Sequence, residues 1–144
     1  MKISTKGKYG IKAMLDLALH CGEGSTPLKD ISERQAISEP YLEQIIAAFK
    51  KGGLVSSIRG VQGGYQLARA AAAISVAEII TVLEGPLLPF EAGEYAQAPE
   101  ELVLGKLWDR AREEISALLD NVSLADLAAE VKKIRENNAP MYYI

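Results

Sequence analysis

The 144-residue sequence predicts a mainly α-helical protein with one small β-hairpin. Apolar residues recur at helical spacing along most of the chain, and only residues 54 to 68 contain two short strand-like runs, separated by glycines. A helix followed by a glycine-tipped hairpin is the layout of a winged helix. The fold class expected is therefore a winged helix-turn-helix domain, followed by a long helix of the kind used for dimerisation.

Capping signals place three helices before the hairpin. The first begins after Ser4 or Thr5 and ends at a pair of glycines. Thr26 is expected to cap a short helix over about residues 27 to 35, with a proline as its first residue. Ser38 caps the third helix after a gap of only a few residues. Two helices so close together predict a helix-turn-helix.

The third helix combines an apolar face with a polar one. Its apolar residues recur at i, i+3, i+4 and i+7 and are Leu42, Ile45, Ile46 and Phe49. The opposite face carries Pro40, Gln44, Ala47 and Lys51, with Glu43 and Tyr41 on its shoulders. Small and hydrogen-bonding side chains suit close approach to base edges, where Gln pairs with adenine and Glu accepts from cytosine. An ordinary solvated face would have the same composition, so this helix alone leaves both interpretations open.

The hairpin favours contact with DNA. Its strands are expected over residues 54 to 58 and 65 to 68, and Arg59 and Gln62 lie among the glycines between them. Glycines permit a tight tip and a close approach to phosphate, and an arginine beside such a tip can enter a minor groove. The glycines by themselves would indicate only a good turn. Arg59 is what makes DNA the preferred interpretation.

Charge is divided unevenly along the chain. Residues 1 to 70 hold ten basic and six acidic residues, a net charge of +4, whereas residues 71 to 144 hold six basic and thirteen acidic residues, a net charge of −7. The basic half is the half with the predicted winged helix, as attraction to phosphate requires.

A fourth helix closes the first domain. Ser75 and Glu78 form a predicted capping box, and the helix ends at Gly85. The next residues contain three prolines and several acids, which indicate a linker. The expected division is residues 1 to 85 for the winged helix-turn-helix domain, 86 to 100 for the linker, 101 to 136 for dimerisation helices and 137 to 144 for a C-terminal tail.

A heptad pattern in the helix predicted over about residues 100 to 120 requires a partner helix. The seam consists of Leu104, Trp108, Ala111, Ile115, Leu118 and Val122. Its partner comes either from a second copy or from the last helix of the same chain, over residues 124 to 135, which Ser123 caps. Winged-helix proteins usually bind paired half-sites, so a homodimer is favoured over an intramolecular fold-back.

Composition argues against several functional classes. One cysteine, Cys21, and one histidine, His20, cannot supply a zinc site, an iron–sulfur cluster or a catalytic triad, so no metal, cofactor or enzymatic activity is expected. Oxidation of Cys21 is an alternative route for a signal, but a buried and inert cysteine is favoured. A signal-peptide pattern and a run of about 18 apolar residues are both lacking, so a cytoplasmic location away from membranes is expected.

Four motifs, taken in order, resemble those of a known family. They are Thr5-Lys6-Gly7-Lys8-Tyr9-Gly10, Ser38-x-x-Tyr41-Leu42-Glu43-Gln44, Gly53-Leu54-Val55 and Arg59-Gly60-x-x-Gly63-Gly64-Tyr65. Together they resemble the winged-helix repressor family that includes IscR, NsrR and CymR. The likeness is strongest to the CymR branch of cysteine-metabolism repressors, because Leu83-Glu84-Gly85-Pro86 and the final Met141-Tyr142-Tyr143-Ile144 are also similar. The cysteine cluster of the iron–sulfur members is absent from this sequence.

The resemblance implies a dimeric repressor that binds double-stranded operator DNA. The residues that the resemblance implies at the DNA are Tyr9, Ser38, Tyr41, Glu43, Gln44, Arg59, Gly63 and Gly64. Lys6, Pro40, Gln62 and Tyr65 are expected at the DNA with them. Cysteine synthase (O-acetylserine sulfhydrylase) is an implied partner, whose active site accepts peptide tails that end in isoleucine. The tail Met141, Tyr142, Tyr143 and Ile144 has suitable chemistry, with two aromatic rings and a terminal carboxylate. Packing of this tail on its own dimer is the other interpretation.

An alternative function is a protein-interaction module that regulates an enzyme through its tail without specific DNA binding. Binding by such a module would depend little on salt, whereas DNA binding weakens steeply as salt rises.

Overall fold

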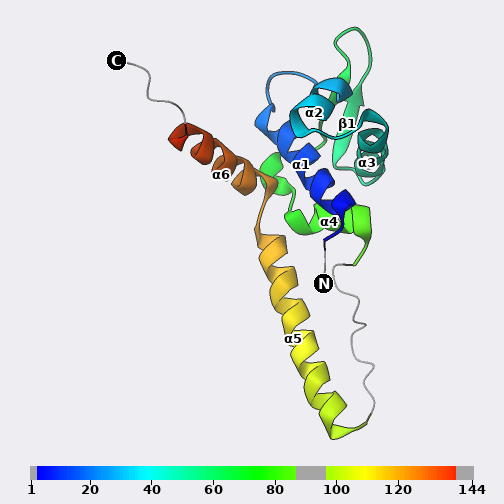
Figure 1. Cartoon of the computed structure of the whole chain (residues 1–144), viewed down its shortest axis with the longest axis vertical. Coiled ribbons are helices and arrows are strands. Elements are labelled where there is room, and N and C mark those ends of the chain that lie inside the picture. The colour runs from blue at the N-terminus through cyan, green and yellow to red at the C-terminus, as the bar shows by residue number, and fades with distance from the viewer. Residues whose placement is uncertain (1–2, 87–96, 139–144) are drawn as a thin grey trace.

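The structure, a computed structural model, describes residues 3–86 and 97–138 of the chain (Figure 1). Its elements are the helices α1 (Thr5–Leu19), α2 (Leu28–Gln35), α3 (Glu39–Lys51), α4 (Val76–Glu84), α5 (Pro99–Asn121) and α6 (Leu124–Asn137), the strands β1 (Val55–Ile58) and β2 (Gly64–Leu67), and the short 3-10 helix η1 (Ala71–Ala73). The two strands pair antiparallel. A mainly helical architecture with one small hairpin confirms the predicted fold class. Within the described ranges, every helix is too short or too polar to cross a membrane.

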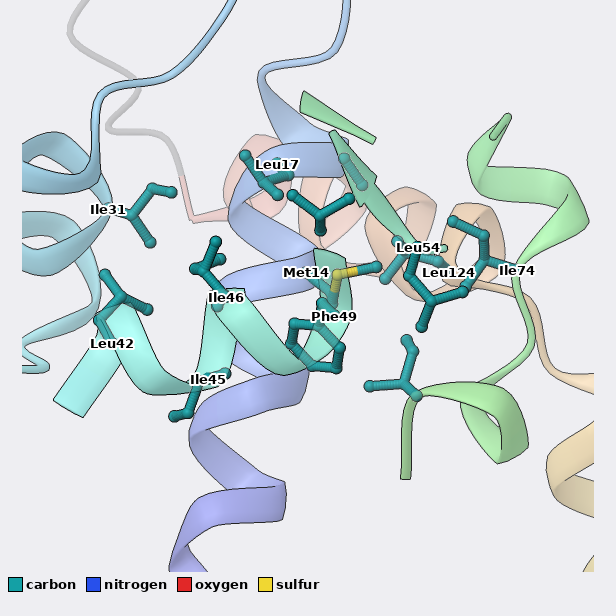
Figure 2. Close-up of a cluster of buried hydrophobic side chains, with 14 of the residues drawn as sticks. Met14, Leu17, Ile31, Leu42, Ile45, Ile46, Phe49, Leu54, Ile74 and Leu124 are labelled. Carbon is teal, nitrogen blue, oxygen red and sulfur yellow. The ribbon is translucent and has the colours of Figure 1, made fainter. Parts of the chain in front are cut away.

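One hydrophobic core joins the helices of the first domain to the hairpin (Figure 2). Its largest side chain is Phe49 of α3, which is fully buried among residues such as Met14 of α1, Ile31 of α2 and Leu54. All four residues predicted for the apolar face of α3 are at most 1% exposed. The core therefore fixes the rotation of α3 and directs the opposite face of this helix to solvent.

The start of α1 is tied to the end of α4. Ser4 donates its backbone N–H to Oε1 of Glu84 at 3.0 Å, and its hydroxyl accepts from the N–H of Gly7 at 3.1 Å. Further along α1, a Cβ atom on Gly10 would meet the side chains of Leu83 and Phe49. The absence of a side chain at Gly10 thus allows α1 to pack closely on α3 and α4.

A buried carboxylate fixes α2 on α1. Asp16 is 1% exposed and accepts hydrogen bonds from Arg34 Nε at 2.9 Å, Arg34 Nη2 at 2.8 Å and Gln35 Nε2 at 3.0 Å. Burial alone would raise the pKa of Asp16, but the hydrogen bonds from Arg34 and Gln35 and the charge of Arg34 together hold it below its ordinary value. This group orients the helix-turn-helix, and the sequence analysis did not identify it.

The structure confirms two of the predicted helix caps, at Ser75 and Ser123, and contradicts a third, at Thr26. The capping box of Ser75 and Glu78 is confirmed, and Ser123 likewise caps α6. The prediction for α2 is wrong, because its N-cap is Pro27 and not Thr26. The reason is that Thr26 has extended backbone, which pairs with Tyr65 of β2.

The last two helices take different directions. α5 begins far from the domain and reaches it near α4, whereas α6 lies against α1 and η1 (Figure 1). Leu124 and Ala128 of α6 are buried in the same core as α1. An intramolecular fold-back of this last helix along the heptad seam is therefore wrong, and α6, grouped by the sequence with the dimerisation helices, packs on the winged-helix domain.

A backbone junction explains the position of α6. The N–H of Val76 donates to the carbonyl of Val122 at 2.9 Å, and the N–H of Leu124 donates to the carbonyl of Ile74 at 2.8 Å. Val122 is the C-cap of α5 with extended backbone, so the helical part of the seam ends before it. These long-range hydrogen bonds hold the start of α6 beside the start of α4.

Candidate nucleic-acid interface

The polar face of α3 is open to solvent. Pro40, Glu43, Gln44 and Ala47 are all exposed, as predicted from their spacing. Ser38 is the N-cap of this helix, but its hydroxyl makes no hydrogen bond to the first turn. The hydroxyl therefore remains available to an external acceptor such as a phosphate oxygen.

Two of the sequence-predicted residues contact each other between α1 and α3. The rings of Tyr9 and Tyr41 pack edge to face, with centroids 5.8 Å apart and planes at 81°. Both residues are half-buried, and the Nζ atom of Lys12 lies 6.0 Å from the centroid of the Tyr9 ring. This pair positions the start of α3 on α1 and brings a lysine close to it.

The hairpin between β1 and β2 forms the predicted wing. Ser57 pairs with Tyr65 and Ile58 with Gly64, which leaves residues 59–63 as the tip. A Cβ atom on Gly63 would approach the carbonyl oxygen of Ile58 to 2.6 Å, so this turn requires glycine there. Arg59 and Gln62 are exposed on either side of the tip.

The loop before α2 anchors the wing to the rest of the domain. Thr26 and Tyr65 exchange two backbone hydrogen bonds, each 2.8 Å long. The hydroxyl of Ser25 donates to the carbonyl of Gln62 near the tip. A Cβ atom on Gly64 would collide with the backbone of Thr26, so glycine at this position permits the close approach. The wing is thereby held in a fixed position relative to the helix-turn-helix.

The exposed cations of the basic half differ in their partners. Arg69 is paired with Glu78 at 2.8 Å, and this hydrogen bond, with one from the backbone of Ser75, lowers the pKa of the Glu78 carboxyl below its ordinary value. Within the described residues, no ion pair involves Lys6, Lys50, Lys51 or Arg59. These four side chains keep their charge available for phosphate.

A second surface lies on α5. Five of its large apolar residues, on one side of the helix, are between 39% and 69% exposed: Val103, Leu104, Leu107, Trp108 and Leu118. Ala111 and Ile115 of the predicted seam are half-buried. We call Val103, Leu104, Leu107, Trp108 and Leu118 the apolar face of α5. It is wider than the seam, because Val103 and Leu107 were not part of the heptad pattern.

Sequence reasoning missed or misjudged a few residues at these sites. Val61, at the tip of the wing, is fully exposed, and no motif drew attention to it. The anchoring role of Ser25 depends on a contact 37 residues away, which has no local signal. Cys21 is exposed, so the expectation of a buried cysteine is wrong; it follows the last turn of α1, where the chain leaves the core. The predicted tail residues and most of the predicted linker lie outside the described residues.

A fixed wing, an outward-facing polar helix and unpaired cations together define a winged-helix protein of the type that regulates transcription. The Rrf2 family model, described as "Iron-dependent Transcriptional regulator", matches residues 3–130. The chain belongs to this family of transcriptional regulators.

Its relatives support the same assignment. The chain is 45% identical to the HTH-type transcriptional regulator CymR of Bacillus subtilis (strain 168) over the full length of both proteins. It is also 45% identical to the HTH-type transcriptional regulator IscR of Erwinia tasmaniensis, over 88% of this chain and 78% of that one. These relatives are named as regulators and not as enzymes, in agreement with the sequence analysis.

Solved structures resemble the chain closely. The structure of CymR, described as the global cysteine regulator of B. subtilis, matches with a TM-score of 0.81 and 45% identity over 90% of this chain and 98% of that one. The IscR structure from T. potens matches with a TM-score of 0.76 and 46% identity over 99% and 95% of the two chains.

The family description mentions iron, but the donor set of this chain does not fit an iron–sulfur cluster. Such clusters are held by several cysteine thiolates, sometimes with histidines, and the whole sequence contains one cysteine and one histidine. Elsewhere in the described part of the chain, no three His, Cys, Asp or Glu side chains are grouped so that they could hold a metal ion.

Proposed function

We propose that this protein is a homodimeric, sequence-specific DNA-binding repressor that places α3 in the major groove and the wing beside it. The observation that carries the proposal is the combination of an exposed polar face on α3 with a wing that is fixed to the same domain. Gln44 and Glu43 present amide and carboxylate groups to base edges, and Ser38 presents a free hydroxyl to the backbone. Lys6, Lys50, Lys51 and Arg59 supply the positive charge.

The DNA-binding proposal is tested by titrating the full chain against a duplex that the chain itself selects from a randomised pool. We expect affinity to fall steeply as salt rises. Arg59→Ala is expected to weaken binding to every duplex about tenfold, and Gln44→Ala to relax the preference at one base pair. Arg135→Ala on α6 is the matched control and should bind like the parent. Affinity that is independent of salt, or unchanged by both substitutions, would instead favour the protein-interaction module.

The apolar face of α5 supports the homodimer. A two-fold axis would pair this face with itself, as in most homodimers, and would place two copies of α3 on successive half-sites. Because α6 packs on the domain of its own chain, it does not compete for this surface. Sedimentation of the full chain should give the mass of two chains.

The likeness to CymR also supports a role in the control of cysteine and sulfur metabolism, with cysteine synthase as the partner that carries the signal. The final residues, Met141 to Ile144, would enter the active site of that enzyme. We would titrate purified cysteine synthase with the full chain and with a chain that lacks these four residues. Loss of binding on truncation is expected. If neither form binds, the protein remains a repressor that receives its signal by another route.

A further inference from the structure

A cavity lies beneath the root of the wing. It has a volume of about 240 Å³ and is enclosed by the end of α1, the loop that follows it and strand β2. The residues used below are Leu17, His20, Cys21, Gly24, Tyr65 and Leu67, all of which line it. Of these six residues, Tyr65 is also among those expected at the DNA, and none belongs to the apolar face of α5.

Strand β2 has β1 on one edge, and its other edge borders the cavity at Leu67 without a partner strand among the described residues. The N–H of Ala68 bonds to the carbonyl of Leu54, so residues 68 and 66 direct their backbone groups toward β1, whereas residues 65 and 67 direct theirs away from it. The outward groups of Tyr65 bond to Thr26. Those of Leu67, one N–H donor and one carbonyl acceptor, have no hydrogen bond within the described part of the chain.

The chain nearly supplies a third strand at this edge. If the pairing of Thr26 with Tyr65 continued, Gly24 would be opposite Leu67. Gly24 instead has φ of +87°, which turns the backbone out of the extended conformation. The cavity therefore occupies the place that the next strand residue would fill.

We propose that this cavity binds a small ligand with the adjacent donor and acceptor of an amino acid or a single peptide unit. The ligand pairs with the N–H and carbonyl of Leu67, as an added strand pairs with an open sheet edge. The volume of the cavity is below the range of about 300–1,000 Å³ that is typical of pockets for drug-sized ligands. The cavity therefore suits a single residue and not a longer peptide. Leu17 and Tyr65 provide apolar contact for the side chain of the ligand.

His20 adds a third polar group to this site. Its Nδ1 atom lies 2.7 Å from Oε2 of Glu23, and this contact orients the ring. The other ring nitrogen has no hydrogen bond among the described residues and is available to the ligand. The site thus offers three polar groups on two elements, one of which is the wing strand.

Occupation of this cavity is coupled to the wing. Thr26 and Ser25, which anchor the wing, belong to the same loop that encloses the cavity. A ligand paired with Leu67 adds hydrogen bonds to the root of the wing and orders it, so DNA binding tightens. Typical couplings between two sites change affinity by about 5- to 150-fold. This coupling rests on the proposed DNA-binding function, whereas ligand binding itself does not.

The binding step is tested on the full chain without DNA. Amide hydrogen exchange should be fast at Leu67 and slow at Gln66 and Tyr65, and protection of the Leu67 amide equal to theirs would overturn the proposal. Common amino acids and their N-acetyl amides, added at millimolar concentration, are the probes. At least one should shift the amide resonance of Leu67. If none does, the proposal is wrong.

Two substitutions at Cys21 distinguish the cavity from other surfaces. Cys21→Phe places a ring where the cavity is and should abolish the shift, while Cys21→Ser keeps the cavity open and should retain it. An unchanged shift in Cys21→Phe would overturn the assignment of the ligand to this cavity. If that variant fails to fold, the exchange and resonance measurements at Leu67 in the parent chain still decide whether a ligand binds there. The coupling is then measured as DNA affinity with and without the bound probe, and equal affinities would refute it.

Discussion

The winged-helix domain and α5 both have regular apolar patterns, but the patterned residues are buried in the domain and largely exposed in α5. In the domain, the apolar faces of α1, α3 and α4 meet in one core, and residues such as Phe49 and Ile79 are completely buried. In α5, Gly105 is the one buried residue of the helix. Leu104 and Leu118 are exposed, although they lie in a regular heptad pattern. The apolar pattern of the domain is therefore satisfied within one chain. The apolar face of α5 stays exposed in the single chain, and its burial is left to the proposed homodimer.

The largest effect is expected from a substitution at the centre of the domain core, where Phe49 is the largest fully buried side chain. Phe49→Ala deletes a fully buried ring and should lower the free energy of unfolding by about 3–5 kcal/mol, from lost burial and the cavity left behind. Urea unfolding followed by circular dichroism measures this change. The matched control is Trp108→Ala on α5, which is 39% exposed and should cost the monomer much less. Equal losses in the two variants, both measured at concentrations where the chain is monomeric, would contradict the comparison.

The second prediction addresses the apolar face of α5. Leu118→Lys would bury two charges in the proposed dimer and should weaken dimerisation by about 2 kcal/mol or more, while the monomer stays folded. Ala117→Lys is the control, because the adjacent exposed residue points to another side of the same helix. Analytical ultracentrifugation over a range of concentrations measures both. If the two variants dimerise equally well, the interface lies elsewhere.

A third prediction concerns the buried carboxylate of the domain. Asp16→Asn keeps the shape but loses charge-assisted hydrogen bonds from Arg34, and should cost about 1–3 kcal/mol of stability at neutral pH. The pKa of Asp16 is lower in the folded than in the unfolded chain, so its contribution is present above the unfolded pKa. That contribution is lost as pH falls through the folded pKa. The difference in stability between parent and Asp16→Asn should therefore shrink in acid, and a difference independent of pH would contradict this account.

The success of sequence reasoning differed between local and long-range features. The caps at Ser75 and Ser123 depend on residues three positions apart, so the sequence was sufficient to predict them. Thr26 looked like a cap by the same local rule, but its backbone pairs with Tyr65, 39 positions away along the chain. The docking of α6 and the exposure of Cys21 likewise depend on which segments meet in three dimensions. At the candidate interface, spacing was enough to predict that Gln44 faces outward, whereas the anchoring of the wing by Ser25 required the structure.

The smallest expected effect is at the tip of the wing. Val61 is fully exposed and has no role in packing, so Val61→Thr should change stability by less than about 0.5 kcal/mol. If the tip enters a minor groove, replacement of one methyl group by a hydroxyl removes apolar contact worth about 0.8 kcal/mol, or about fourfold in DNA affinity. Val103→Thr, the same exchange on the apolar face of α5, should leave the affinity of the preformed dimer for DNA unchanged. Fluorescence anisotropy on the selected duplex resolves a fourfold difference, and equal affinities for parent and Val61→Thr would place the tip outside the groove. A fourfold loss of DNA affinity without a change in stability would show that this exposed apolar side chain contacts DNA.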